Sequence, residues 1–287
     1  MNPRIVLVMA QLTIREISRR RILWVLTILS LVSVALVGWG VSRLVGLSRQ
    51  NDVNAYELEI GVSQILILIA FMFSFVLAMS AAFLAAPAIA SDVETGTVLA
   101  MLARPMHRAD LVVGRWLGLA IIVAVYAAGS GLLAIVVVRF ISDYSPPSTA
   151  VALGFLAFQA VAVMTAALAL GTRLPGIAAG AVTVVLFGLG WFTGVLGSLS
   201  NAFGVKSLAG LGDVFRLLFP TDGLWRGVIY GLEPSQVVVA TEQGGRVAQS
   251  NPFFADAPPP VAFTVWCVVW VVLVLGLGAW LFRRREL

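Results

Sequence analysis

The sequence predicts an all-α integral membrane protein with six transmembrane helices. Hydrophobic residues make up 60% of the 287 positions and charged residues 11%, and the mean hydropathy is +0.99. A soluble domain is about 45–50% apolar and about 25% charged. Each apolar run is near or above the roughly 20 residues that cross about 30 Å of hydrocarbon. None shows the apolar/polar alternation of a membrane β-barrel strand, so the spans are helices.

The six predicted spans belong to one transmembrane domain that takes in residues 1–287. Each span is an apolar run bounded by charged or turn-forming residues. They cover about residues 22–42, 60–86, 114–138, 150–171, 177–197 and 261–282.

Residues 3–20, ahead of the first span, have too little apolar length to cross a membrane. Polar side chains recur at helical spacing in this segment and form a stripe, at Arg4, Gln11, Arg15, Ser18 and Arg19. This pattern predicts an interfacial helix that lies in the plane of the membrane surface. The alternative is an ordinary positively charged flank of the first span.

The arginines set the predicted orientation. With the N-terminus in the cytoplasm, the cytoplasmic segments hold 12 of the 19 basic residues but only 5 of the 14 acidic residues. Basic residues collect on the cytoplasmic side of membrane proteins. We therefore expect a multi-pass protein of the cell (cytoplasmic) membrane of a bacterium, with both termini in the cytoplasm. The net charge of +5 reflects this topology and does not indicate nucleic-acid binding.

The segment 198–260, before the last span, is expected outside the cytoplasm and partly helical. Apolar residues recur every three or four positions from 205 to 219, which predicts an amphipathic helix that ends at Pro220. A second short helix is predicted at 225–232. The prolines at 258–260 then lead into the sixth span.

The polar insert between the second and third spans is the most informative segment. Its charged side chains cannot lie in hydrocarbon, where each would cost roughly 2.5–3.5 kcal/mol. Ser91-x-x-Glu94 has the form of a capping box that opens a helix, and Arg104-Pro105 ends it. The coupling region at 91–113 is therefore predicted to hold a short cytoplasmic helix on which a partner docks.

Several activities are excluded by residues that the sequence lacks. The one lysine, Lys206, has no glycine directly before it, so the chain has no phosphate-binding P-loop and does not hydrolyse ATP itself. The spans hold no Asp, Glu, Lys or His away from their ends, which disfavours an ion-coupled carrier. The sole histidine, His107, lacks the convergent partners of a metal site. No catalytic residue, metal ligand or bound cofactor is assigned.

Three polar residues inside spans are candidates for lining a translocation pathway: Gln64, Gln159 and Thr165. The alternative is that such side chains form hydrogen bonds between helices. Glycine pairs at four-residue spacing also permit close contact, within the chain or between two copies, at Gly114/Gly118, Gly176/Gly180 and Gly190/Gly194.

The insert resembles the signature that type-2 ATP-binding cassette (ABC) exporter permeases carry between their second and third spans. The residues that carry the resemblance are Glu94-Thr95-Gly96-Thr97, Leu102-Ala103-Arg104-Pro105, Arg108 and Gly114-Arg115. The chain departs from the family pattern in having Arg115 where Lys is frequent. The charged ending at 282–286 is also similar, and the likeness in number and order of spans extends over effectively the whole chain.

The resemblance implies that this chain is a permease subunit of an ABC exporter, with a coupling helix at about 92–102 that inserts into a separate ATPase subunit. That partner, and not this chain, would bind ATP and Mg. The residues implied to dock are Asp92, Glu94, Gly96, Thr97, Val98, Leu99, Leu102, Arg104, Pro105 and Arg108.

Within this docking set, the resemblance implies that the permease and the ATPase approach each other closely at Gly96. It also implies that Arg104, Pro105 and Arg108 fix the turn into the third span. The helix at 3–20 is similar to the elbow helix of the family. One chain would form half of a pathway, so a second copy or a paralogue is implied.

The alternative interpretations are an ion-coupled secondary carrier, a membrane scaffold that transports nothing, and an intramembrane enzyme. Nucleotide dependence of transport in reconstituted vesicles would separate them. The apolar composition does not identify the substrate, because every span must be apolar to lie in lipid.

Overall fold

The computed structural model of the chain describes residues 2–19, 21–50, 55–97, 107–203, 206–234, 251–255 and 257–285. Every regular element within these ranges is a helix, so the predicted all-α class is confirmed. The helices are α1 (Pro3–Ser18), α2 (Arg21–Gln50), α3 (Ala55–Ala85), α4 (Pro87–Glu94), α6 (Arg108–Ser142), α7 (Thr149–Gly171), α8 (Gly176–Phe203), α9 (Lys206–Leu218), α10 (Thr221–Leu232) and α13 (Val261–Arg283).

Six helical stretches in the described part of the chain are long and apolar enough to cross a membrane, as predicted. They are α2, α3 together with α4, α6, α7, α8 and α13. Several run further than the apolar runs that predict them, and α2 continues to Gln50 rather than ending near residue 42. At 1.5 Å per residue, the 30 residues of α2 extend about 45 Å, so its polar end reaches beyond the hydrocarbon layer.

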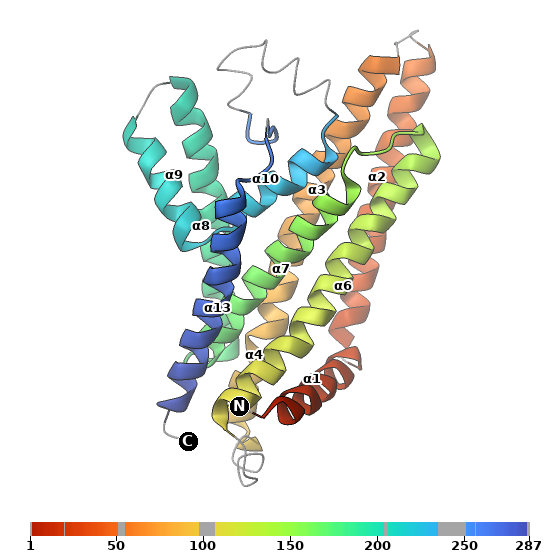
Figure 1. Ribbon diagram of the computed structural model, residues 1–287. Helices are drawn as coiled ribbons and strands as arrows, with labels where there is room; N and C mark the ends of the chain where they lie inside the picture. The colour runs from red at the N-terminus through yellow and green to blue at the C-terminus, as the bar shows by residue number, and fades with distance from the viewer. Residues whose placement is uncertain are drawn as a thin grey trace.

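α7 is the central helix of the bundle (Figure 1). It contacts α3, α6, α8, α10 and α13. The most apolar stretch of α7 is 61% buried, whereas the corresponding stretches of α6 and α13 are each only 22% buried. α6 and α13 therefore present most of their apolar surface outward, to lipid or to another protein.

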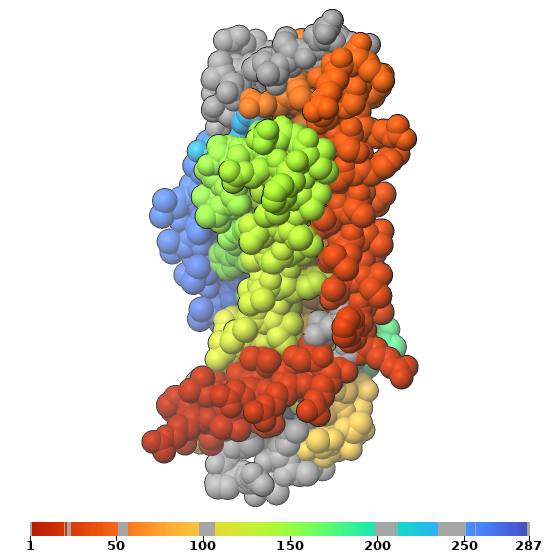
Figure 2. Space-filling model, turned by 90° about the vertical axis from the view of Figure 1, so that its right-hand side faces the viewer, coloured from red at the N-terminus to blue at the C-terminus, as the bar shows by residue number. Residues whose placement is uncertain are grey.

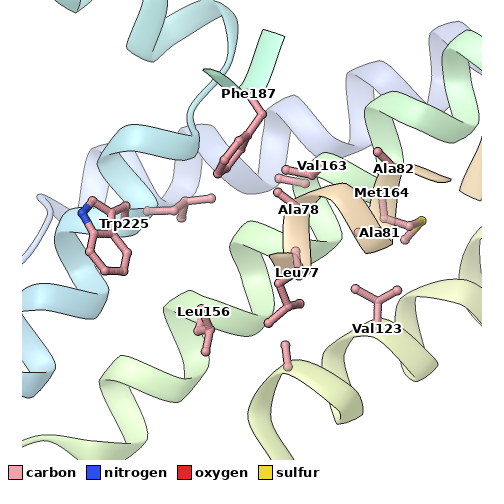
Figure 3. Packing of buried hydrophobic residues seen from close by; sticks show 14 of the residues in the cluster. Leu77, Ala78, Ala81, Ala82, Val123, Leu156, Val163, Met164, Phe187 and Trp225 are labelled. Carbon is pink, nitrogen blue, oxygen red and sulfur yellow. The ribbon is translucent and has the colours of Figure 1, made fainter. Parts of the chain in front are cut away.

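Small side chains allow α3 and α7 to pack closely, as Figure 3 shows. The residues that meet there are almost fully buried and include Ala78, Ala81 and Ala82 of α3 and Val163 and Met164 of α7. Close packing of small residues is a main source of helix association in a membrane, where burial of apolar surface gives no advantage over lipid.

The glycine pairs serve contacts within this chain. A Cβ atom at Gly118 would lie 2.7 Å from the carbonyl oxygen of Ala10, so α1 rests directly on α6. A Cβ atom at Gly180 would lie 2.8 Å from the ring of Phe83 on α3. One at Gly194 would overlap a carboxylate of α10. The sequence leaves open whether these glycines serve contacts within the chain or between two copies. The structure shows contacts within the chain.

The predicted capping box is wrong, because its serine lies inside a helix. α4 begins at Pro87, after a turn at the end of α3, and ends at Glu94. The Oγ atom of Ser91 donates to the carbonyl oxygen of Pro87 (2.6 Å) instead of capping an N-terminus. Proline suits a first helical turn, where its missing N–H costs no hydrogen bond, so it sets the start of the helix.

The chain after α4 turns at Gly96, where φ is +71°. Glycine adopts this left-handed conformation without steric cost. Among the described residues, nothing lies within 4 Å of a Cβ atom placed at this position. Its left-handed conformation therefore explains a glycine here. The rest of the predicted coupling helix, residues 98–102, lies outside the described residues, as does the turn predicted after it at 103–106.

α9 and α10 lie at the end of the bundle opposite the chain termini (Figure 1). α9 ends two residues before Pro220. α10 begins directly after this proline, four residues earlier than the helix predicted at 225–232. The proline again precedes a first turn, where its missing N–H is not needed.

Two tryptophans of α13 fasten that helix to α9. The indole N–H of Trp266 donates to the carbonyl of Leu217 (3.1 Å), and that of Trp270 donates to the carbonyl of Leu218 (2.8 Å). The last carbonyls of a helix have no partner within the helix, so these donors satisfy groups that would otherwise be unpaired.

Candidate partner-docking site

Four segments meet at the end of the bundle where both chain ends lie: α1, α4, the start of α6 and the end of α13 (Figure 1). Figure 2 shows α1 lying across the ends of the long helices, with α4 beside it. This surface includes the described part of the predicted coupling region at 91–113.

α1 is amphipathic in the structure. Its inner face packs on α6 through Val6, Met9, Ala10, Thr13 and Ile17. Its outer surface combines exposed arginines with Leu7, Val8 and Leu12, which are 51–56% exposed. An apolar surface beside positive charges suits a helix in the membrane–water interface. The in-plane position predicted for residues 3–20 is compatible with this surface.

Arg115 of α6 joins three elements of the site. One end of its guanidinium donates to Glu16 of α1 (Nη1 to Oε2, 2.8 Å), and the other donates to Asp92 of α4. The Arg115 side chain is only 5% exposed. We call these three residues the Arg115 clamp. Because the planar guanidinium carries donors on two edges, it can hold two carboxylates at once.

Asp92 takes part in the clamp, so its carboxylate points into the chain. Its side chain is 14% exposed. The resemblance implies that Asp92 contacts a partner, and the structure shows it pairing with Arg115. Glu94 and Thr97, by contrast, are exposed at the end of α4.

The structure places only some of the predicted docking residues. Glu94, Gly96 and Thr97 follow one another at the exposed end of α4, and Arg108 begins α6. The remaining members of the predicted docking set lie outside the described residues: Val98, Leu99, Leu102, Arg104 and Pro105.

Arg108 holds the end of α13. Its Nη1 atom donates to the carbonyl oxygen of Arg285 (2.7 Å) and more weakly to that of Arg283 (3.3 Å). Arg285 in turn donates from Nη1 to the carbonyl oxygen of Thr172 at the end of α7 (2.7 Å). Basic side chains at helix C-termini satisfy free carbonyls and complement the helix dipole. Arg108 therefore links α6 to α13, a role that the sequence does not reveal.

Asp110 holds the beginning of α1. It is fully buried in the first turn of α6 and accepts a hydrogen bond at Oδ2 from the backbone N–H of Asn2 (3.4 Å). A carboxylate in a first turn is favoured by the helix dipole.

In the described part of the chain, no three His, Cys, Asp or Glu side chains are grouped to hold a metal ion.

Two of the three pathway candidates form hydrogen bonds between helices. Gln159 is buried and donates from Nε2 to the carbonyl oxygen of Thr221 on α10 (3.4 Å). Thr165 is buried and accepts from the indole of Trp116 on α6 (2.8 Å). Gln64 is half-buried. An apolar cavity of about 40 Å³ lies between α2, α3, α6, α7 and α10, and none of the three lines it.

Residues 7–287 match the family model described as ABC-2 family transporter protein. The match takes in nearly the whole chain and all six spans. The chain belongs to the ABC-2 transporter family. A search of individual curated proteins found no match.

Membership of the ABC-2 transporter family confirms the predicted type-2 ABC permease. The family comprises transmembrane components that are generally not enzymes, and its general partner is an ABC ATPase. The candidate docking surface is therefore part of a transporter subunit.

Proposed function

We propose that this chain is the membrane-spanning permease subunit of an ATP-driven exporter and forms half of its translocation pathway. A separate ATPase subunit, which carries ATP and Mg, docks at the surface formed by α1 and α4. Both termini and this docking surface face the cytoplasm. The Arg115 clamp carries the proposal, because it joins both docking elements to α6, which is a membrane span.

The clamp supports coupling because it resists separation. Removing one partner of a buried ion pair costs about 3–5 kcal/mol. Asp92 and Arg115 are only 14% and 5% exposed, so separating them would leave both charges poorly solvated, and α6 is expected to follow a displacement of α4. The contact of Gly118 with α1 adds a second rigid connection to the same span.

ATP binding would close two ATPase subunits and displace the α4 region of each docked permease. The displacement would pass through the clamp to α6. Two copies of this chain, or this chain and a paralogue, would then rearrange around a shared interface to release substrate on the other side. The outward apolar surfaces of α6 and α13 supply area for such an interface.

The docking contact itself is proposed to centre on the exposed end of α4. Glu94, Gly96 and Thr97 would contact the ATPase together with the segment that follows them, while Arg108 would position the return into α6. Asp92 would act through the clamp.

The direct test is reconstitution of the chain with the ATPase encoded beside it. Glu94→Lys should abolish co-purification of the ATPase and nucleotide-dependent transport, whereas the matched control Glu94→Gln, which reverses no charge, should keep both. Both variants should have wild-type thermal stability, because Glu94 is exposed. Transport in the absence of nucleotide would instead support an ion-coupled carrier. An absence of transport both with and without nucleotide would support a scaffold.

Orientation can be measured by thiol labelling. The native thiol, Cys267, is fully buried and should not react. His107→Cys, beside the docking surface, should react with an impermeant maleimide only from the cytoplasmic side. Ser145→Cys, which is exposed beyond the other end of α6, should react only from the outside. The reverse pattern would refute the proposed orientation.

A further inference from the structure

The outer face of α1 carries three exposed arginines, Arg4, Arg15 and Arg19. At 3.6 residues per turn they fall within about 60° of one another around the helix, opposite the face that packs on α6. We call these three residues the arginine stripe. In the part of the chain that the structure describes, none of their guanidinium groups forms an ion pair or a side-chain hydrogen bond.

The rest of this helix does not neutralise the arginine stripe. Glu16 is the one acidic residue of α1, and its Oε2 atom lies 2.8 Å from Nη1 of Arg115 on α6. Apolar side chains share the outer face with the arginines: Leu7, Val8 and Leu12 are 51–56% exposed. Positive charge beside exposed apolar surface is typical of helices that lie between lipid headgroups and acyl chains.

α1 lies at the level where α6 enters the apolar layer. Carbonyl oxygens of α1 are 2.9 Å and 2.7 Å from Cβ atoms placed at Gly114 and Gly118 of α6. Arg115, between these glycines, is the last charged residue of α6 before Arg139. The uncharged stretch between the two arginines is long enough to cross the hydrocarbon. Figure 2 looks onto α1, and no described segment covers it there, so its outer face meets the headgroup layer.

Two tryptophans mark the same membrane surface. Trp24 lies in the first turn of α2, directly after α1, and is 71% exposed. Trp280 lies in the last turn of α13, and the guanidinium carbon of Arg284 is 4.2 Å from the centroid of its ring. Tryptophan is enriched at membrane–water interfaces, where the long side chain of arginine reaches the headgroups. The depth assigned to α1 therefore agrees with these two residues.

We propose that the arginine stripe binds anionic phospholipids of the membrane leaflet at this end of the bundle. Lipid phosphates would accept hydrogen bonds from the guanidinium groups, because the fork of arginine donors matches two phosphate oxygens. The acyl chains would lie against the exposed leucines and valine of the same face. Each basic residue near an anionic membrane surface strengthens binding about fivefold, so three on one face select lipids with a net negative charge.

Lipid binding at α1 goes beyond ATP-driven transport, because it requires neither nucleotide nor an ATPase. It is also compatible with a docking contact centred on the exposed end of α4. The arginine stripe faces sideways from the bundle, whereas α4 ends at the tip of the bundle (Figure 1, Figure 2).

The test uses the full chain in mixed micelles without an ATPase. Native mass spectrometry compares retention of phosphatidylglycerol, which has a net negative charge, with that of phosphatidylcholine, which has none. The α1 variant combines Arg4→Gln, Arg15→Gln and Arg19→Gln. The control variant removes the same charge from exposed arginines on other segments, by Arg49→Gln, Arg139→Gln and Arg173→Gln. Both variants should keep the wild-type melting temperature, because all six side chains are exposed.

The wild type and the control variant should retain phosphatidylglycerol in preference to phosphatidylcholine. In the α1 variant this preference should fall more than about tenfold, and Arg15→Gln alone should lower it about fivefold. An unchanged preference in the α1 variant would overturn the proposal. An equal loss in the control variant would also overturn it, because net charge alone would then explain binding. Loss of ATPase co-purification with an unchanged lipid preference would assign the arginines to docking instead.

The depth of α1 gives a second test. A spin label on Leu12→Cys, in vesicles, should be more accessible to oxygen, which concentrates in lipid, than to a water-soluble nickel complex. The native thiol of Cys267 is fully buried and should not take the label. Greater accessibility to nickel would place the outer face of α1 in water and overturn the proposal.

Discussion

Replacing Arg115 by methionine tests the clamp most directly. Methionine keeps an unbranched apolar side chain of similar reach but removes the charge and both hydrogen bonds. Asp92, with a side chain only 14% exposed, would be left as a nearly buried carboxylate without its arginine. Removing one partner of a buried ion pair costs about 3–5 kcal/mol. Because some solvent still reaches Asp92, we expect a loss of stability of about 3 kcal/mol.

The two carboxylates should contribute very unequally. Glu16 is 40% exposed, and ion pairs at exposed positions are worth about 0–1 kcal/mol. Glu16→Gln should therefore change stability by less than about 1 kcal/mol. Arg115→Met combined with Asp92→Leu should recover most of the stability lost in Arg115→Met, because the nearly buried carboxylate that has lost Arg115 is then gone.

The assay is equilibrium unfolding in mixed micelles, with Glu16→Gln as the control for removal of a surface pair. Transport in vesicles gives a second measurement, since the stable double variant should still have lost its coupling. The reasoning would be refuted if Arg115→Met were as stable as the wild type. It would also be refuted if Glu16→Gln were destabilised as strongly as Arg115→Met.

Three further predictions concern other contacts. Gly118→Leu should displace α1 from α6 and increase its digestion by protease, whereas Gly129→Leu, on the same helix but with open space beside it, should not. Arg108→Ala should expose the end of α13 to carboxypeptidase but cost only about 1 kcal/mol in unfolding experiments, because water replaces its partners. Burial raises the pKa of Tyr144, whose hydroxyl donates to the carbonyl oxygen of Leu232 (2.7 Å). Near pH 10 only the unfolded state then loses this proton, so the free energy of unfolding should fall as the pH rises through about 10. Tyr144→Phe should lack this fall. In thermal melts at neutral pH this variant should lose about 1 kcal/mol of stability.

The number of spans could be predicted because an apolar run long enough to cross lipid is a local property of the sequence. The helix ends could not be placed as well. α6 begins at Arg108, six residues before the apolar run suggests, because a helix continues into water wherever its residues tolerate it. Hydropathy marks the edge of the lipid and not the end of the hydrogen-bonded backbone.

The capping box failed for a different reason. The pattern Ser91-x-x-Glu94 also fits inside a helix, and the competing signal was Pro87 four residues earlier. Proline restricts the backbone directly, whereas a serine caps a helix only if the preceding residues are not already helical. Here Pro87 is the stronger signal.

The clamp could not be predicted from the sequence. Arg115 is separated from Glu16 by 99 positions and from Asp92 by 23. No periodic pattern relates residues so far apart, and each one has an ordinary explanation as a charge near a membrane surface. The glycine spacing predicted close helix contact but not which helix would occupy the space.

α13 is a rigid helix that connects the two ends of the bundle. Its 23 residues are about 35 Å long, and a helix of this length changes little in length under axial load. Near one end Arg108 donates to the carbonyl oxygens of Arg283 and Arg285, and near the other Trp266 and Trp270 donate to carbonyl oxygens of α9. The most apolar stretch of α13 is only 22% buried within the described part of the chain. The first and last residues of α13 lie about 35 Å apart, so a displacement of one end of this rigid helix is expected to reach the opposite end of the bundle.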